Sequence, residues 1–236
     1  KKKVAVNYFA STKEYVQVKP DYYVICSPEY FVPEDKKDYA EQRALTFKAL
    51  IEKTAWPMVF VVPALAKSRK SWQKPFIDHE YIQLRFMNTT PVEGFRWFRH
   101  RMFQSGIGMP RPHNVLVACI YLSIKIRFKE VYVAGADHSW LKEIFVTEEN
   151  DVLVGQKHFY DQQTKNQTVE VNRPDPKPMY KGGTTQTRRL HEVLEKFYVS
   201  FKSYWVLKSF ADAMDVPVFN VTEGSFIDAF ERKRIL

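Results

Sequence analysis

Residues 130–140 read EVYVAGADHSW, an apolar run that ends at a glycine and continues into polar side chains. A short β-branched run closed by glycine is typical of a buried strand. Ligands of parallel α/β sheets bind beyond the carboxyl ends of the strands. We therefore expect residues 135–140 to lie at the ligand-facing edge of an α/β domain.

Upstream of this strand, residues 22–62 predict a βαβ unit. Residues 22–26 form one apolar run, and residues 58–62 form a second, continuous one that is typical of a strand covered on both faces. Between them, residues 34–54 carry apolar side chains at helical spacing, namely Ala40, Ala44, Phe47 and Ile51.

The remaining segments extend the same alternation of strands and helices. We expect strands at 4–10, 81–86 and 216–220, a basic loop at 64–79, helices at 95–103, 115–128 and 185–215, and a hairpin that pairs 144–146 with 152–154. The long helix carries the apolar stripe Leu190, Leu194, Phe197, Phe201, Tyr204, Leu207 and Met214. The pattern predicts a single Rossmann-like α/β domain over residues 1–236, with a mostly parallel sheet flanked by helices and a lid-like insertion around 141–183.

The amino-acid composition limits the size of the core and the kinds of partner that this chain can have. A chain of 236 residues with 45% hydrophobic content can bury one sizeable core. Its 36 basic and 27 acidic residues give a formal charge of +9, which favours acidic partners such as an anionic membrane surface or a phosphorylated substrate. We do not expect nucleic acid as the partner. The basic and aromatic segments 67–76 and 96–101 either face a membrane-associated acceptor or form an ordinary solvated surface.

Cysteine usage and hydropathy predict a cytoplasmic protein that is either soluble or peripheral at the inner membrane. Cys26 and Cys119 lie in apolar runs, which predicts buried free thiols, and no CxxC pair is present. The apolar stretch 115–126 is interrupted by polar residues and is too short to cross a bilayer. The N-terminal residues do not resemble a signal peptide.

The candidate binding residues follow from the predicted topology. Asn7, Ser27, residues 135–140 and residues 220–225 should meet at the carboxyl edge of the sheet, which includes Ser225. The loop at 105–114 opens a helix whose N-terminus attracts phosphate, and Asn114 either caps that helix or binds a ligand. Asp137 orients a ribose hydroxyl, holds a metal, or accepts hydrogen bonds in its own turn.

Three histidines are candidate general bases, because an unperturbed imidazole titrates near neutrality: His138, His158 and His191. No GxSxG, P-loop, HExxH or DxD pattern is present, which predicts a site without metal.

The order of these motifs resembles the CMP-sialic-acid-dependent bacterial sialyltransferases. The segments that carry the resemblance read VNYFA at 6–10, KPDYYV at 19–24 and FKEVYVAGADHS at 128–139. They are also similar to a domain of unknown function shared by flagellin-modifying accessory factors and 6-hydroxymethylpterin pyrophosphokinases. In the sialyltransferases a further strand with a Gly-Asn-Gly-Pro-Ser loop precedes the position of Val6, so either the full protein has residues before Lys1 or its donor site differs.

The resemblance implies roles for residues that match the motifs. It places Asn7, His113 and Asn114 against the nucleotide, and Ser139 and Trp140 where the family binds phosphate. Gly135, Asp137 and His138 then organise the nucleotide pocket. The catalytic histidine of the family follows a lid, which points to His191 or, within the presumed lid, to His158. Tyr160 in the same segment is a further donor-binding candidate.

The resulting hypothesis is a metal-independent glycosyltransferase of surface polysaccharide or lipopolysaccharide biosynthesis, with no cofactor. It would use a CMP-activated acidic sugar as donor and a glycan or glycolipid as acceptor. One alternative is a 6-hydroxymethylpterin pyrophosphokinase-like transferase, which would require Mg²⁺ and a carboxylate cluster to hold it. Another is a nucleotide- or carbohydrate-binding module without catalytic activity.

Overall fold

The computed structural model describes residues 1–31, 37–155, 176–181 and 184–234. It is a mixed α/β protein whose chain divides into two compact units. The first comprises Lys1–Lys129 and Ser209–Val216, and the second comprises Glu130–Lys208 and Pro217–Leu236. The single domain over 1–236 stays a prediction.

The first unit is built on a four-stranded parallel sheet, sheet A, in the order β1-β2-β3-β4. Its strands are β1 (Val4–Val6), β2 (Tyr22–Val24), β3 (Met58–Pro63) and β4 (Ile82–Met87). Tyr22 pairs with Val59 and Met58 with Ile82, so β3 is central and β4 lies at the edge. The expected edge strand is therefore confirmed.

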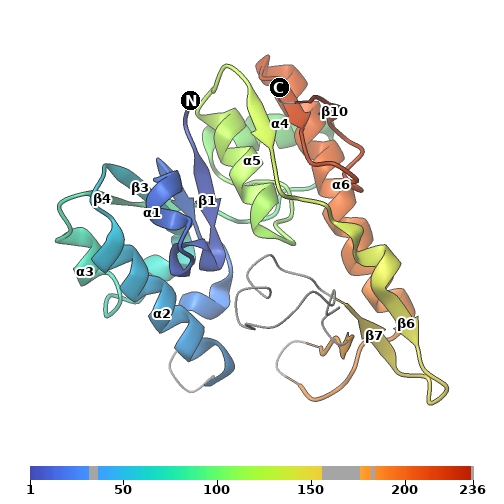
Figure 1. Ribbon diagram of the computed structural model, residues 1–236. Helices are drawn as coiled ribbons and strands as arrows, with labels where there is room; N and C mark the ends of the chain where they lie inside the picture. The colour runs from blue at the N-terminus through green and yellow to red at the C-terminus, as the bar shows by residue number, and fades with distance from the viewer. Residues whose placement is uncertain (32–36, 156–175, 182–183, 235–236) are drawn as a thin grey trace. The chain divides into compact units, whose positions relative to one another are not determined.

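Helix α2 (Lys37–Lys53) connects β2 to β3, which confirms the βαβ unit (Figure 1). Its buried face differs from the predicted stripe. Thr46 and Leu50 are fully buried, and Phe47 and Ile51 pack at the margin of the core, whereas Ala44 is exposed. Thr46 belongs to the buried face although it is polar, so an apolar pattern did not reveal it.

Aromatic side chains fill the core of this unit. Tyr15, on the short helix α1 (Tyr15–Val18), Tyr23 and Phe60 are fully buried. Tyr15 and Tyr23 meet edge to face with ring centroids 5.9 Å apart, an arrangement that aromatic quadrupoles favour. Short 3-10 segments follow three of the strands: Asn7–Ser11, Pro28–Phe31 and Ala64–Ser68.

The segment 64–79 corrects the sequence prediction. It was expected to be a basic loop, but it contains helix α3 (Lys74–Ile77) as well as a 3-10 turn. Phe76 is fully buried 4.9 Å from the ring of Phe60, and Trp72 packs against the same core. These aromatics therefore belong to the core of the first unit.

Two further helices complete the first unit: α4 (Arg96–Ser105) and α5 (Val115–Lys125). Both confirm predicted helices. Phe103 of α4 and Tyr121 of α5 are buried with Phe210, which lies on the C-terminal part of α6 (Leu190–Met214).

The described residues of the second unit form two sheets. Sheet C is parallel with the order β10-β9-β5, formed by β5 (Val131–Val133), β9 (Val218–Asn220) and β10 (Glu231–Arg232). The other sheet is antiparallel and consists of β6 (Ile144–Val146), β7 (Val152–Val154) and β8 (Lys177–Pro178). Ile144 pairs with Val154, which confirms the expected hairpin. The lid role of 141–183 stays a prediction, and residues 156–175 lie outside the described part.

Helix α6 contributes its Leu190–Lys208 portion to the second unit. Val193 and Phe197 pack on the β6–β7 hairpin in a small core that Trp140 also contacts. Leu190 and Leu194, which belonged to the predicted apolar stripe, are exposed. The buried stripe of this helix begins instead at Val193.

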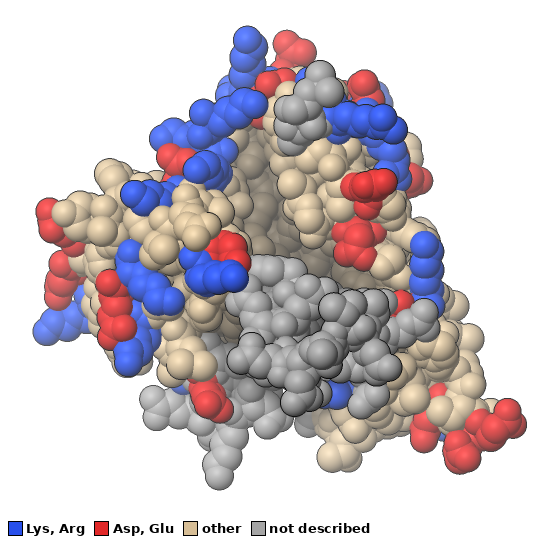
Figure 2. All heavy atoms as spheres, in the orientation of Figure 1, with Lys and Arg blue, Asp and Glu red and all other residues tan. Residues whose placement is uncertain are grey.

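Three further features concern the hydropathy of the helices, the distribution of surface charge and the state of the cysteines. Among the described helices, none has both the length and the apolar character needed to cross a bilayer. Lysine and arginine side chains are interspersed with acidic ones in the view of Figure 2, so on this face the charge of +9 does not form one continuous basic patch. Cys26 and Cys119 are free, and burial raises the pKa of both thiols.

Candidate functional site

The turn after β5 has a conformation that its sequence explains. Gly135 has φ +70°, in the left-handed region that glycine adopts without steric cost. His138 has φ +51°, which is uncommon for a residue with a Cβ. These two residues reverse the chain at the carboxyl end of β5 and leave Asp137 exposed between them.

The Asp137 carboxylate is held by its own turn. It accepts hydrogen bonds from the backbone N–H and the hydroxyl of Ser139. Partial burial works against ionisation, but the hydrogen bonds from Ser139 and from nearby backbone N–H groups outweigh it and lower the pKa of Asp137. At neutral pH this exposed group is therefore a fixed negative charge.

The loop after β9 is tied to the same turn. The Ser225 hydroxyl donates to the carbonyl of Ala136 at 2.6 Å, and the Ala136 N–H donates to the Thr222 hydroxyl at 3.1 Å. The N–H of Phe226 donates to the carbonyl of Asp137 at 2.7 Å. Residues 135–140 and 220–225 thus meet at the carboxyl edge of sheet C, as the topology predicted.

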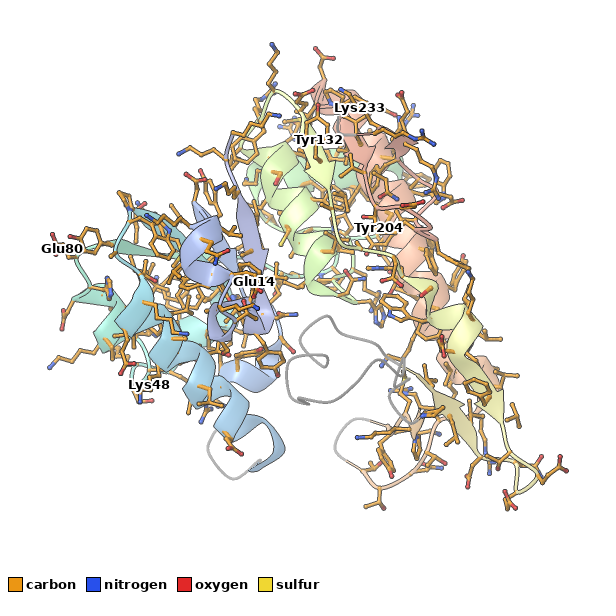
Figure 3. The ribbon with its side chains drawn as sticks, in the orientation of Figure 1. Glu14, Lys48, Glu80, Tyr132, Tyr204 and Lys233 are labelled. Carbon is orange, nitrogen blue, oxygen red and sulfur yellow. The ribbon has the colours of Figure 1, made fainter. Side chains whose placement is uncertain are left out.

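His138 is a half-buried, neutral histidine. Its Nε2 is hydrogen-bonded to the hydroxyl of Tyr204 on α6 at 2.6 Å (Figure 3). Its ring lies 4.1 Å from that of Trp140, which in turn stacks on Phe197 at 5.3 Å. Burial lowers the pKa of His138 from 6.5 to about 4, although the Asp137 carboxylate opposes the shift. The imidazole therefore carries no charge at neutral pH.

A cavity of about 700 Å³ lies at the carboxyl ends of β9 and β10. Its walls are Asn220–Gly224 and three consecutive cations, Arg232–Arg234. The Arg232 guanidinium donates to the carbonyl of Ser225, so the cationic wall is bonded to the loop that holds the Asp137 turn. The Lys233 ammonium donates to the Tyr132 hydroxyl at 3.0 Å, and the two side chains lie side by side in Figure 3.

The predicted residues Asn7, His113 and Asn114 belong to the first unit. Asn7 follows β1 with φ +49°, and its buried Oδ1 has no hydrogen-bond partner among the described residues. Asn114 caps α5, because its side-chain oxygen accepts the N–H of Val117 at 3.2 Å. His113 is exposed in the preceding loop. A site that joins these residues to the Asp137 turn stays a prediction.

Only one of the two proposed bases lies in the described part of the chain. His191 is exposed in the first turn of α6, beside Glu192, which forms an ion pair with Lys181 at 2.9 Å. His158 and the donor-binding candidate Tyr160 lie outside the described residues.

Sequence reasoning missed several residues at this edge. Tyr204 was assigned to an apolar stripe, and only its hydroxyl distinguishes it from the other members. The run ERKR at 231–234 was the signal that marked the cationic wall. In the described part of the chain, no group of three or more His, Cys, Asp or Glu side chains is arranged to hold a metal ion.

Comparison with protein-family models, with curated proteins and with solved structures returns no match to this chain.

Proposed function

We propose that this protein is a metal-independent glycosyltransferase of surface polysaccharide or lipopolysaccharide biosynthesis that uses a CMP-activated acidic sugar. The proposal includes a Rossmann-like domain, in which the carboxyl edge of sheet C binds the donor. One observation carries it. An ionised, exposed carboxylate is joined through Ser225 to a cavity of about 700 Å³ whose lining has three cations and one acidic residue, Glu223.

The two charges suit the two parts of such a donor. Carboxylates accept hydrogen bonds from hydroxyl groups, so Asp137 would bind the ribose or the sugar. Arginine and lysine form charge-assisted hydrogen bonds with phosphate and carboxylate, both of which a CMP-activated acidic sugar carries. The residues Arg232–Arg234 would therefore neutralise the anionic part of the donor and stabilise the departing CMP.

The reaction then needs a base and a leaving group. The base removes the proton of the acceptor hydroxyl, whose oxygen bonds to the anomeric carbon of the donor. The bond between that carbon and the phosphate oxygen breaks, and CMP leaves with the electron pair. With a pKa of about 4, His138 is too weak a base at neutral pH, so His191 and His158 remain the proposed bases.

The remaining assignments form part of the same proposal. Asn7, His113 and Asn114 would contact the nucleotide, and Gly135, Ser139, Trp140, Tyr160 and Ser225 would shape or line the donor site. The buried, unpaired Oδ1 of Asn7 supports this, because a buried acceptor without a donor is destabilising unless something satisfies it. The protein would act in the cytoplasm on a glycan or glycolipid at the inner membrane.

A thermal-shift panel tests the donor class. The full chain is incubated with CMP, UDP, GDP, ATP or a pterin, with and without Mg²⁺. We expect CMP to raise the melting temperature without Mg²⁺, and Asp137→Asn to reduce that shift. Asp151→Asn is the matched control, since Asp151 is an exposed aspartate on the hairpin of the same unit. Stabilisation by ATP with Mg²⁺ and none by CMP would favour the pyrophosphokinase-like alternative.

A turnover assay tests the base. Release of CMP from CMP-sialic acid is measured for the wild type and for His158→Ala and His191→Ala separately. We expect one variant to lose turnover while CMP still stabilises it. Unchanged turnover in both would reject the base assignment. CMP binding without turnover in the wild type would instead indicate a binding module.

A further inference from the structure

Helix α4 presents unusually exposed aromatic side chains. Phe95, which precedes the helix, is 78% exposed, Trp97 is 70% exposed and Phe98 is 39% exposed. The rings of Trp97 and Phe98 meet edge to face with centroids 6.1 Å apart. Scattered exposed apolar residues are ordinary, but three within four positions form a patch that needs an explanation.

The opposite side of α4 is firmly packed. Phe103 is fully buried, and its ring lies 5.4 Å from that of Phe210. The Tyr121 hydroxyl donates to the Phe103 carbonyl at 2.8 Å, and the His100 ring lies 5.6 Å from Phe210. The helix is therefore fixed in its orientation, and the exposed aromatics belong to a second face that no described residue covers.

The helix is also basic, and its Arg101 follows Trp97 by one turn on the exposed face. Arg96 and Arg101 are exposed, Arg99 is half-buried, and α4 contains no acidic residue. The nearest acidic residue before the helix, Glu93, forms an ion pair with Arg111 at 2.9 Å. An anionic partner would therefore encounter arginines on a helix that carries no carboxylate of its own.

We infer that this face of α4 docks on an anionic bilayer, with Phe95, Trp97 and Phe98 at the level of the headgroups. Tryptophan and other amphipathic rings prefer that level, and arginine is attracted to anionic headgroups. Short amphipathic helices with aromatic and basic residues bind membranes in this way, without spanning them. The inference rests on the first unit alone and does not depend on the proposed glycosyltransferase activity.

Vesicle co-sedimentation of the full chain tests the inference. Partition is compared between pure phosphatidylcholine and an equimolar mixture of phosphatidylcholine and phosphatidylglycerol. We expect binding to the mixture only, and weaker binding at higher salt. Trp97→Ser should lower the partition coefficient roughly ten-fold, since a buried aromatic surface is lost. Arg101→Gln should lower it about five-fold.

Two control variants distinguish binding through this face of α4 from nonspecific hydrophobic or electrostatic binding to vesicles. Trp205→Ser removes a tryptophan that is 52% exposed on α6, and Lys48→Gln removes an exposed lysine of α2 that Figure 3 labels. We expect both to bind vesicles like the wild type. Because Trp97 and Arg101 are exposed, their variants should keep the wild-type melting temperature, which is checked first.

Several results would overturn the inference. They are equal binding to both vesicle types, no binding to the mixture, or equal loss in the α4 variants and the controls. Self-association that Trp97→Ser abolishes, without vesicle binding, would assign the face to a protein interface. Binding of RNA in place of vesicles, lost in Arg101→Gln, would assign it to nucleic acid.

Discussion

The half-buried, neutral state of His138 predicts a specific loss of stability on acidification. As the pH falls below 6.5, the unfolded chain takes up a proton at this imidazole, whereas the folded chain does so only near its pKa of about 4. Because the unfolded state then binds more protons, this contribution to folding is fully present above pH 6.5 and is lost progressively towards pH 4.

The pKa difference sets the size of the effect. One pKa unit corresponds to about 1.4 kcal/mol, so the separation of 6.5 from about 4 corresponds to about 3 kcal/mol of unfolding free energy. About 2 kcal/mol of this is lost between pH 7 and pH 5. Most carboxylates remain ionised in that window, so the histidine contribution can be separated from theirs.

Urea unfolding at pH 7 and at pH 5 measures this loss in the wild type, in His138→Asn and in His191→Asn. Asparagine tolerates the left-handed backbone at residue 138 and does not titrate. We expect His138→Asn to be less stable at pH 7 but to lose about 2 kcal/mol less than the wild type on acidification. His191→Asn, at an exposed position, should follow the wild type.

Equal pH dependence in the wild type and in His138→Asn would refute the assignment of a neutral, half-buried imidazole. A proton NMR titration gives a second, direct readout. We expect the His138 ring signals to remain constant between pH 8 and pH 5.5, and a midpoint near 6.5 would contradict the burial argument.

Three further predictions concern the fold. Both thiols should react with a disulfide reagent at pH 8 at least about 100-fold more slowly in the native than in the urea-unfolded protein. The reason is that burial raises the pKa of Cys26 to about 12. Equal rates in the two states would show that the thiols are accessible in the native protein. Gly135→Ala should cost about 1 kcal/mol of unfolding free energy, since its φ is +70° but its added Cβ meets no atom within 4 Å. Gly108→Ala should cost more, because its Cβ would lie 2.8 Å from the Thr90 carbonyl oxygen, and the reverse order would contradict the steric argument. Phe76→Ala should cost roughly 3–5 kcal/mol, and a loss below about 1 kcal/mol would remove Phe76 from the core.

The sequence predicted the elements of this protein better than their buried faces. Continuous β-branched runs such as 58–62 and a helical stripe across 34–54 are local signals, and both were confirmed. Which side chains are buried depends on what packs against them. Ala44 is exposed and Thr46 is buried, and apolar periodicity along α2 contains no information on which neighbours pack against the helix.

At the candidate site, too, local signals could be predicted from the sequence, whereas contacts between distant residues could not. The turn at 135–140 and its meeting with 220–225 could be predicted, since parallel strands place their carboxyl ends at one edge. The partner of His138 could not, because Tyr204 is 66 residues away in sequence and only the tertiary fold brings them together. The basic and aromatic segments at 67–76 and 96–101 look alike in sequence, yet Phe76 is fully buried and Trp97 is 70% exposed.

The hydrogen bond between His138 and Tyr204 gives the site a link to the long helix. A non-glycine residue in the left-handed region costs roughly 1–2 kcal/mol, and the bond to α6 helps to hold it there. By linkage, any molecule that favours this turn also favours the helical state around Tyr204. Occupancy of the Asp137 edge would then slow amide hydrogen exchange in the middle of α6, so that helix could report on ligand binding without contacting the ligand.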